Sequence, residues 1–371
     1  MTAAEILREL VAIASPSALS NLPLLRWVEG FLKPRGWRVE LLPYDDEAGV
    51  AKANLLAWPG DGELAGHVDL AFVCHTDTVP FAVNWAGALQ LTERDGSLHG
   101  CGSCDVKGSL ACFLAAVSGL DSSEISDSVA LILTADEEIG CRGMERLLVG
   151  ILGGLRIRSA IVSEPTSLQP GIAGKGYGLA RVTVEGREAH SAFPVEGVSA
   201  ISAAARLIVR IEDELRLSCA EDALFDPPRT TVNIGVIEGG TAKNIVAVKC
   251  SFLVEWRGIP SEEPGRVLGE LRRIADGFAQ DGLAIRIDGL RDEAGFSPAA
   301  AGPLRERLAS LLDGDPIGIS FGSEASRLAW IADEVIVIGP GDMRTAHSDR
   351  ECVPVAELER WTAVLGELLR N

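Results

Sequence analysis

Short apolar runs alternate with helical stretches through the first half of the chain, and this alternation constrains the fold most. The runs include Val68 to Val73, Val129 to Leu133 and Ala160 to Val162, and a helical stretch covers Gly108 to Leu120. Strands that are apolar throughout are typical of parallel sheets with helices on both faces. The pattern therefore predicts an α/β domain with a mostly parallel sheet.

A second pattern interrupts the first. We expect strand, helix, strand, strand, helix and strand, in that order, at Leu179 to Val184, Gly197 to Glu214, Thr230 to Ile237, Val246 to Trp256, Glu262 to Gln280 and Leu283 to Ile287. This is the βαββαβ order of a ferredoxin-like unit. The run Glu334 to Ile338 then predicts another strand of the first sheet. We therefore predict a first domain over residues 1–174 and 289–371 and an inserted domain over 175–288.

Composition limits the partners and the location. The chain has 371 residues and is 47% hydrophobic, which is enough for two domains. Its formal charge of −19 argues against nucleic-acid binding, which needs a basic face. Glu5, Arg8 and Glu9 make the amino terminus unlike a signal peptide, and no stretch approaches the roughly 20 apolar residues of a membrane span. We expect a cytoplasmic protein with no membrane contact.

The cysteines are too sparse for a disulfide scaffold, at 8 in the whole chain. Cys101 and Cys104 form the single C-x-x-C pair, and the others stand alone at Cys74, Cys112, Cys141, Cys219, Cys250 and Cys352. A zinc ribbon would need a second pair. Small buried thiols are the favoured interpretation, and a thiol redox protein built on Cys101 and Cys104 is an alternative.

Histidine and acidic side chains follow the apolar runs where strands are expected to end. They are His75, Asp77, Asp105, Glu137, Glu138, Glu164 and His347. Open α/β sheets bind ligands beyond the carboxyl ends of their strands, so we expect these side chains to converge. Imidazole nitrogens with carboxylate oxygens suit zinc, with cobalt or manganese as substitutes. If two ions lie about 3.5 Å apart, one carboxylate must bridge them.

The adjacent pair Glu137 and Glu138 is the strongest indication of catalysis. After a strand has ended, one carboxylate can ligate a metal while its neighbour acts as the base for a hydrolytic water. A single acidic residue there would be read as a solvated loop end. A non-catalytic zinc-binding protein on the same fold remains an alternative, but it would have no chemical need for the second carboxylate.

A family likeness is spread over nearly the whole chain. It rests on these segments: His75 to Pro80, Gly102 to Gly108, Thr134 to Glu138, Glu164 to Pro170, Ala189 to Ser191, Gly239 to Ile245, Phe321 to Ala325, and Gly339 to Gly341 leading to His347. With them the chain resembles the M20 family of di-zinc metallopeptidases, in the branch of acetylornithine deacetylases and succinyl-diaminopimelate desuccinylases. The resemblance implies a zinc-dependent hydrolase of linear amides, with a catalytic α/β domain and an inserted dimerisation domain.

The resemblance also implies a ligand set for two Zn²⁺ ions. One zinc would be held by His75 and Glu164, and the other by Glu138 and His347. Asp105 would bridge both ions.

Three further residues receive catalytic roles from the resemblance. Glu137 matches the general base, which takes a proton from water and passes it to the departing amine. Asp77 matches the carboxylate that orients His75. His190, in the inserted domain, matches a histidine that reaches into the partner subunit's active site, so a homodimer is implied; on the residues alone it could be an ordinary surface histidine.

The substrate-binding residues implied by the resemblance are Asn244, Arg257, Gly322, Ser323 and Glu324. An arginine can bind a carboxylate through two hydrogen bonds, which suits an amino-acid substrate. On the residues alone, Arg257 could equally pair with a nearby acid in a strand.

The implied reaction removes the acetyl group from an N-acetylated amino acid, with N2-acetylornithine in arginine biosynthesis as the first choice. Cys104 and the segment Val254 to Arg257 favour that choice, whereas His99, Cys101 and Asp342 depart from the usual pattern. The alternatives are a succinyl-diaminopimelate desuccinylase, an acetylcitrulline deacetylase and an M20-type carboxypeptidase.

Overall fold

The computed structural model describes residues 1–64, 66–217, 220–278 and 282–370, so Cys219 and the predicted helix end at Gln280 lie outside the described residues. The chain divides into two compact units. The first comprises Met1–Ile172, Pro298–Ile317 and Ser323–Asn371, and the second comprises Ala173–Ser297 and Gly318–Gly322. The second unit extends past the predicted boundary at residue 288 because its last strand runs to Glu293.

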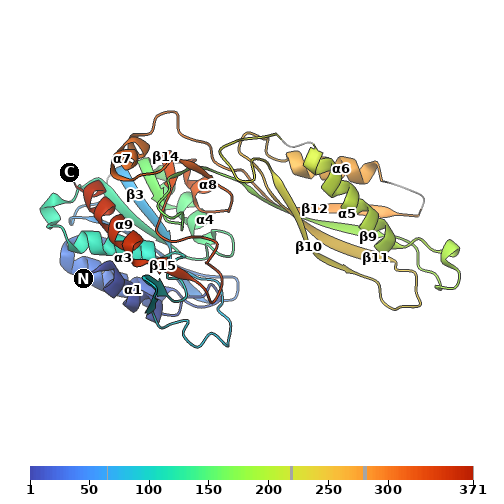
Figure 1. Ribbon diagram of the computed structural model, residues 1–371, viewed down its shortest axis with the longest axis horizontal. Helices are drawn as coiled ribbons and strands as arrows, with labels where there is room; N and C mark the ends of the chain where they lie inside the picture. The colour runs from blue at the N-terminus through green and yellow to red at the C-terminus, as the bar shows by residue number, and fades with distance from the viewer. Residues whose placement is uncertain (65, 218–219, 279–281, 371) are drawn as a thin grey trace. The chain divides into compact units, whose positions relative to one another are not determined.

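The larger sheet has eight strands. Their order is β1 (Trp37–Asp45), β2 (Ala51–Pro59), β6 (Val129–Thr134), β3 (His67–His75), β7 (Arg156–Val162), β14 (Ala332–Val337), β8 (Gly171–Gly174) and β13 (Ile317–Ile319). The four central strands β6, β3, β7 and β14 are parallel, and their neighbours β2 and β8 are antiparallel to them. The predicted mostly parallel sheet is confirmed (Figure 1).

Helices cover both faces of this sheet, as its apolar strands require. They are α1 (Ala3–Ala12), α2 (Leu22–Leu32), α3 (Lys107–Ser118), α4 (Arg142–Val149), α7 (Pro303–Leu311), α8 (Ala325–Leu328) and α9 (Val355–Leu368). Phe72 of β3 shares one apolar cluster with α1, α2, α3 and α9. The next residue, Val73, points to the opposite face and is also buried. Short strands β4 (Thr92–Arg94), β5 (Ser97–His99) and β15 (Cys352–Pro354) form a separate three-stranded sheet.

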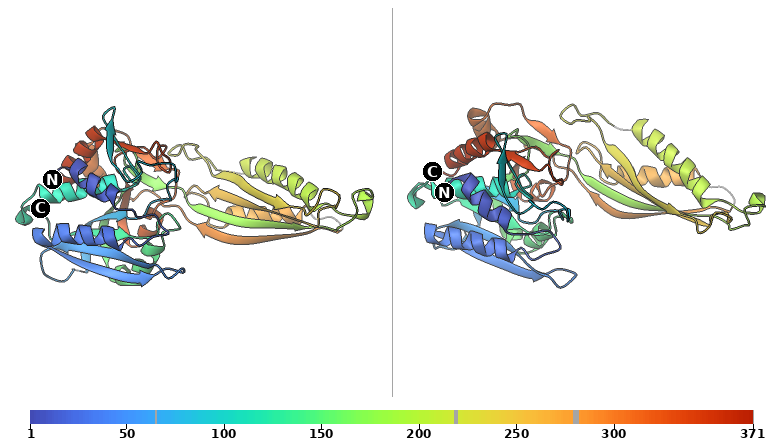
Figure 2. Two further views of the ribbon diagram at one scale, coloured as in Figure 1. Left: turned by 90° about the horizontal axis from the view of Figure 1, so that it is seen from below. Right: turned by 60° about the horizontal axis from the view of Figure 1, so that its bottom comes forward.

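The second unit has the ferredoxin-like order that the sequence predicts. Its elements are β9 (Tyr177–Glu185), α5 (Ala200–Leu217), β10 (Thr231–Gly239), β11 (Lys249–Arg257), α6 (Arg266–Asp276) and β12 (Ala284–Glu293). The strands are antiparallel in the order β10, β11, β9, β12. Helices α5 and α6 pack against one face of the sheet around a single apolar core (Figures 1 and 2). The predicted fold class is confirmed for both units.

Three elements of the second unit begin three or four residues later than predicted. Helix α6 begins at Arg266, after the predicted Glu262. The other two starts are displaced by loop hydrogen bonds. Helix α5 begins at Ala200, after the predicted Gly197, because Val198 pairs with Arg187 in a β-bridge. Strand β11 begins at Lys249, after the predicted Val246, because the Val246 amide donates to a loop carbonyl, that of Ala189. Within the described ranges, no helix combines the length and the apolarity that crossing a bilayer requires.

Candidate metal centre

The carboxyl ends of the central strands bring the predicted ligands together. His75 is the last residue of β3, and it pairs in register with Thr134, the last residue of β6. Glu164 follows β7, which ends at Val162. Asp105 lies in the loop that precedes α3, which begins at Lys107. The loop position leaves its carboxylate free to face the ends of the strands.

Two groups of potential ligands share one carboxylate. The first group is His75, Asp105 and Glu164, and the second is Asp105, Glu138 and His347; within each group the donor atoms lie within 4.8 Å of one another. Asp105 Oδ1 is 2.9 Å from His75 Nε2, and Asp105 Oδ2 is 3.2 Å from His347 Nε2. The Asp105 carboxylate therefore presents one oxygen to each group, which is the arrangement that a bridging ligand needs.

Glu138 provides an observation that these residues fit metal ions. Its Oε2 lies 3.2 Å from His347 Nε2, whereas its Oε1 is buried and has no hydrogen-bond partner in the described part of the chain. A buried, unpartnered carboxylate oxygen is costly in free energy, and a cation beside it would remove that cost. The nitrogen and oxygen donors are also those that divalent zinc, cobalt and manganese accept.

The orientation of His75 is set by a main-chain carbonyl. Its Nδ1 lies 3.0 Å from the carbonyl oxygen of Asp77, which can only accept, so Nδ1 carries a proton and Nε2 would be the atom that ligates a metal. The Asp77 carboxylate was predicted to have this orienting role. However, its Oδ1 is 3.8 Å from His75 Nδ1, which is too long for a hydrogen bond.

The Asp77 carboxylate instead holds the turn that carries the adjacent glutamates. It accepts hydrogen bonds from the backbone N–H groups of Glu137 and Glu138, at 3.1 and 3.3 Å. The Ser17 hydroxyl donates to the same carboxylate at 2.7 Å. Asp77 therefore positions a candidate base and a candidate ligand together, and Ser17 is a supporting residue that the sequence analysis did not identify.

Asp136 anchors the same turn from its other side. Its φ of 59° is a left-handed conformation, and its buried carboxylate accepts from Lys52 Nζ and from the Tyr44 hydroxyl, each at 2.9 Å. The Lys52 and Asp136 side chains are each only 1% exposed. The run Thr134 to Glu138 showed that an acid was present here, but no local pattern pointed to Lys52 or Tyr44 as its partners.

Burial and neighbouring charges shift the pKa values of the site strongly. Burial raises the pKa of Glu137 to about 8, and the charges of Glu138 and Glu324 add to the shift. Burial, followed by the charge of Asp105, raises the pKa of Glu164 well above its ordinary value. Burial lowers the pKa of His75, but its hydrogen bond to Asp105 and the nearby charges outweigh burial and raise it overall. Hydrogen bonds to Asp105 and Glu138 raise the pKa of His347 to about 10.

These shifts predict that loading the site with zinc at pH 7 releases protons. His347, whose pKa lies near 10, holds an extra proton in the metal-free protein at this pH, and the raised pKa values of Glu164 and His75 favour their protonated forms, whereas metal ligands must give these protons up. The apparent zinc affinity should therefore rise with pH. Titration calorimetry in buffers of different ionisation enthalpy measures the released protons, and a pH-independent affinity with no release would contradict this electrostatic description.

The same pKa shifts make the stability of the metal-free protein depend on pH. Each raised group binds more protons in the folded than in the unfolded chain. The contribution of Glu137 to the stability of the metal-free protein is therefore full below pH 4.5, the ordinary pKa of a glutamate, and is lost as the pH rises through about 8.

The thiols near the site are poor nucleophiles. Cys101 and Cys104 are buried; burial raises the pKa of Cys101 to about 11 and that of Cys104 well above its ordinary value. The reactive species is the thiolate, so these shifts argue against the redox alternative. A different cysteine contacts the candidate base: the Cys141 thiol lies 3.3 Å from Glu137 Oε1 and donates to it.

Within the second unit, His190 and Asn244 lie side by side. His190 forms a β-bridge with Ile245, and the Ser191 amide donates to the Asn244 carbonyl. The His190 ring is exposed, and its Nδ1 accepts from the Ala192 amide at 3.0 Å. A neutral ring that accepts at Nδ1 carries its proton on Nε2, so His190 presents a hydrogen-bond donor to solvent.

The other predicted substrate-binding residues fall into two places. Arg257 pairs with Glu255 at 2.9 Å and stacks on the ring of Tyr177, and a Cβ added at Gly322 would lie 3.3 Å from Arg257 Nη1. Ser323 and Glu324 belong to the first unit and are buried. Burial raises the pKa of Glu324 to about 7.

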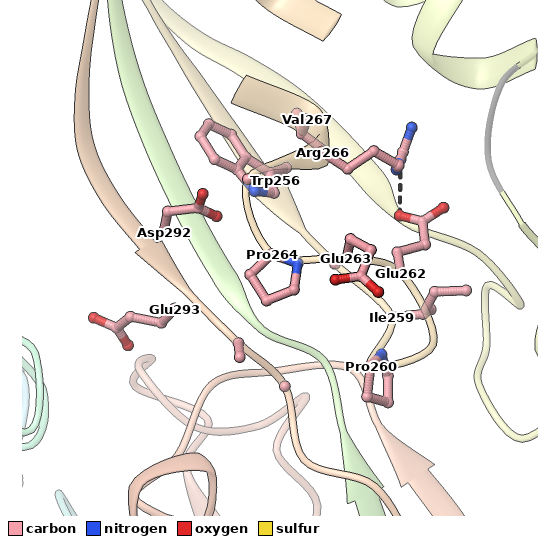
Figure 3. A pocket seen from close by; sticks show the side chains of 14 residues that line it. Trp256, Ile259, Pro260, Glu262, Glu263, Pro264, Arg266, Val267, Asp292 and Glu293 are labelled. Carbon is pink, nitrogen blue, oxygen red and sulfur yellow. Dashed lines mark ion pairs between the residues drawn. The ribbon is translucent and has the colours of Figure 1, made fainter. Parts of the chain in front are cut away.

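The second unit also contains a small pocket at the start of α6 (Figure 3). Its volume is about 70 Å³, and its lining includes Trp256, Asp292 and the ion pair of Arg266 with Glu262 at 2.8 Å. None of the predicted site residues lines it. A pocket of this size has room for only a few waters, so we assign it no substrate.

The chain matches a known protein family and is similar to known proteins over most of its length. The profile of peptidase family M20/M25/M40 matches residues 71–371. An acetylornithine deacetylase of Myxococcus xanthus is 43% identical over 370 residues, which cover 98% of this chain and 96% of that protein.

Solved structures share the fold at low sequence identity. A tripeptidase of Staphylococcus aureus superposes with a TM-score of 0.78 at 21% identity, covering 98% of this chain and 96% of the other. The YXEP protein of Bacillus subtilis, described as a dinuclear metal-binding peptidase of the M20 family, superposes with a TM-score of 0.69 at 16% identity, covering 98% and 95%. The profile match covers most of the chain, and the close relative spans nearly all of it. The chain therefore belongs to peptidase family M20/M25/M40.

Proposed function

We propose that the protein is a zinc-dependent deacetylase that converts N2-acetylornithine to ornithine and acetate, as a step of arginine biosynthesis in the cytoplasm. The observation that carries the proposal is the Asp105 carboxylate, which is shared by two ligand groups and lies in the same site as the adjacent pair Glu137 and Glu138. The substrate follows from the acetylornithine deacetylase of Myxococcus xanthus, which is 43% identical over nearly the whole chain.

Each of these residues has a defined role in the proposed reaction. Two bound zinc ions would make a water acidic and would polarise the amide carbonyl of the substrate. Glu137 takes the proton of that water and later delivers it to the departing amine. Zinc ions bound beside Glu137 would lower the pKa of about 8 that burial gives it in the metal-free protein, and so would favour the carboxylate form that accepts the proton. Asp77 holds the Glu137 backbone in place through its hydrogen bond.

We propose that His190 stabilises the negative oxygen of the tetrahedral intermediate, and that it does so in the partner subunit of a homodimer. The support is its tautomer: the Ala192 amide occupies Nδ1, which leaves an N–H donor at Nε2. Preorganised donors of this kind contribute most when charge develops on oxygen. We propose that Asn244, Arg257 and Gly322 to Glu324 complete the substrate site, with Arg257 near the substrate carboxylate.

The His190 proposal predicts complementation between two inactive variants. His190→Ala should lower kcat by about 10²- to 10³-fold without loss of metal, because one oxyanion donor is removed. Mixing His190→Ala with Glu137→Gln protein under subunit exchange should restore about a quarter of wild-type activity, since half of the dimers are mixed and each has one complete site. If the exchanged mixture showed only the sum of the two variants' separate activities, His190 could not act in the active site of the partner subunit.

The proposed substrate is tested with a panel assayed for primary amine release by zinc-loaded protein. The panel contains N2-acetylornithine, N-acetylcitrulline, N-succinyl-diaminopimelate and simple dipeptides. We expect the highest kcat/KM for N2-acetylornithine, with activity abolished by a chelator and restored by zinc. A preference for the succinyl substrate or for a dipeptide would show that N2-acetylornithine is not the main substrate. Zinc binding without any turnover would favour the alternative of a non-catalytic zinc-binding protein.

A further inference from the structure

The buried carboxylate of Glu351 supports the loop that contains Asp105. Glu351 is 2% exposed. Its Oε2 accepts from the backbone N–H of Gly102 at 3.0 Å, and its Oε1 accepts from the N–H groups of Cys104 and Asp105 at 3.0 and 3.1 Å. Three main-chain donors of one short loop therefore converge on a single side chain that is 246 residues away from Asp105 in sequence.

Glu351 also belongs to the loop that carries His347. Its own amide donates to the carbonyl of Ser348 at 3.1 Å, and its carbonyl accepts from the amide of Gly100 at 3.4 Å. The following strand β15 continues the contact, because Cys352 pairs with His99 of β5. Glu351 thus connects the loop of Asp105, which is common to both ligand groups, with the loop of His347, which completes the second group.

We propose that Glu351 is a positioning residue for both metal sites: by fixing the backbone at Gly102, Cys104 and Asp105 it sets the Asp105 carboxylate between the two ligand groups. This inference rests on the proposed metal-dependent function. Charge-assisted hydrogen bonds from three backbone donors hold a loop more firmly than neutral ones. Residues that hold a metal ligand in place typically change metal affinity about 10- to 100-fold when they are altered.

The substitution Glu351→Gln separates this role from simple burial. Glutamine keeps the size of the side chain but has only one acceptor oxygen, and its NH₂ group must then face one of the three N–H donors. The loop cannot keep all its hydrogen bonds, so Asp105 should lose its fixed position.

The test measures the affinity for each of two zinc ions by competition with a chromophoric chelator, together with the stability of the metal-free protein. In Glu351→Gln both affinities should fall by about 10- to 100-fold together, because Asp105 is common to both groups. Activity should recover at saturating zinc. If Glu351→Gln does not fold, Glu351→Asp keeps the charge with a shorter reach and should weaken both ions by a smaller factor.

Glu334 supplies a matched control. It is also a buried carboxylate at 4% exposure, and it accepts from the backbone N–H groups of Leu304 and Arg305 at 2.8 and 3.0 Å, at the start of α7 and away from both ligand groups. Glu334→Gln should lower stability and leave zinc affinity unchanged.

Two outcomes would overturn the role of Glu351. The first is wild-type affinity for both ions in Glu351→Gln, with a stability loss like that of Glu334→Gln. The second is a loss of affinity for only one of the two ions, because a displaced Asp105, which belongs to both ligand groups, should weaken the binding of both. A wild-type protein that binds two ions yet hydrolyses no acyl amino acid would refute the proposed function, and it would leave the zinc affinities as the independent readout of this inference.

Discussion

The Glu137→Gln variant should bind two zinc ions as tightly as the wild type and lose about 10²- to 10⁴-fold in kcat. Glu137 is in neither ligand group, so the metals do not depend on it. Glutamine has nearly the same shape and can keep the contact with Cys141, but it cannot take a proton from water. Zinc content and steady-state kinetics on N2-acetylornithine measure the two effects separately.

Glu145→Gln is the matched control for this variant. Glu145 lies in the same stretch of chain, on α4, but its side chain is 57% exposed and pairs with Arg327 at 2.8 Å. The same substitution there should leave kcat within about 2-fold of the wild type, because a surface ion pair contributes little. If Glu137→Gln retained near-normal turnover with both metals bound, the base would have to be a different group.

Replacing Lys52 by Met should lower the free energy of unfolding by about 3–5 kcal/mol. The Lys52 ammonium pairs with Asp136 in surroundings where both side chains are 1% exposed, and it also donates to the Ser17 carbonyl. Removing the cation leaves the Asp136 carboxylate buried with the Tyr44 hydroxyl as its remaining side-chain donor. Chemical denaturation of the metal-free protein measures the loss.

The double variant Lys52→Met with Asp136→Asn distinguishes an unpaired charge from lost packing. Asparagine tolerates the φ of 59° at this position and carries no charge, so the double variant should recover part of the stability. The exposed pair of Lys33 with Glu29 gives a control, because Lys33→Met should cost at most about 1 kcal/mol. Equal losses in the single and double variants would mean that the charge of Asp136 is not the cause.

The positions of the candidate ligands could be predicted because they depend on where the parallel strands of the sheet end. Apolar strands buried on both faces form a parallel sheet, and the residues directly after them meet at one edge. His75 and Glu164 follow that rule, and the structure brings them together with Asp105. The pairing of ligands into two groups came from the family resemblance, since no spacing in the sequence shows which carboxylate is shared.

The supporting contacts could not be predicted because they join side chains to the backbone of distant loops. The Glu351 carboxylate binds amides 246 residues or more away, and such pairs leave no periodic pattern. Asp77 was expected to orient His75 with its carboxylate, but the carbonyl of the same residue does so. Helix α5 and strand β11 begin later than predicted, at Ala200 and Lys249, for a related reason: hydrogen bonds of the preceding loops determine where each element begins.

The most direct test of the two-metal site is anomalous scattering at the zinc edge from a crystal of the zinc-loaded protein. We expect two peaks on either side of the Asp105 carboxylate, one beside His75 and Glu164 and the other beside Glu138 and His347. A single peak, or two peaks that do not share Asp105, would contradict the bridged site and the hydrolytic mechanism built on it.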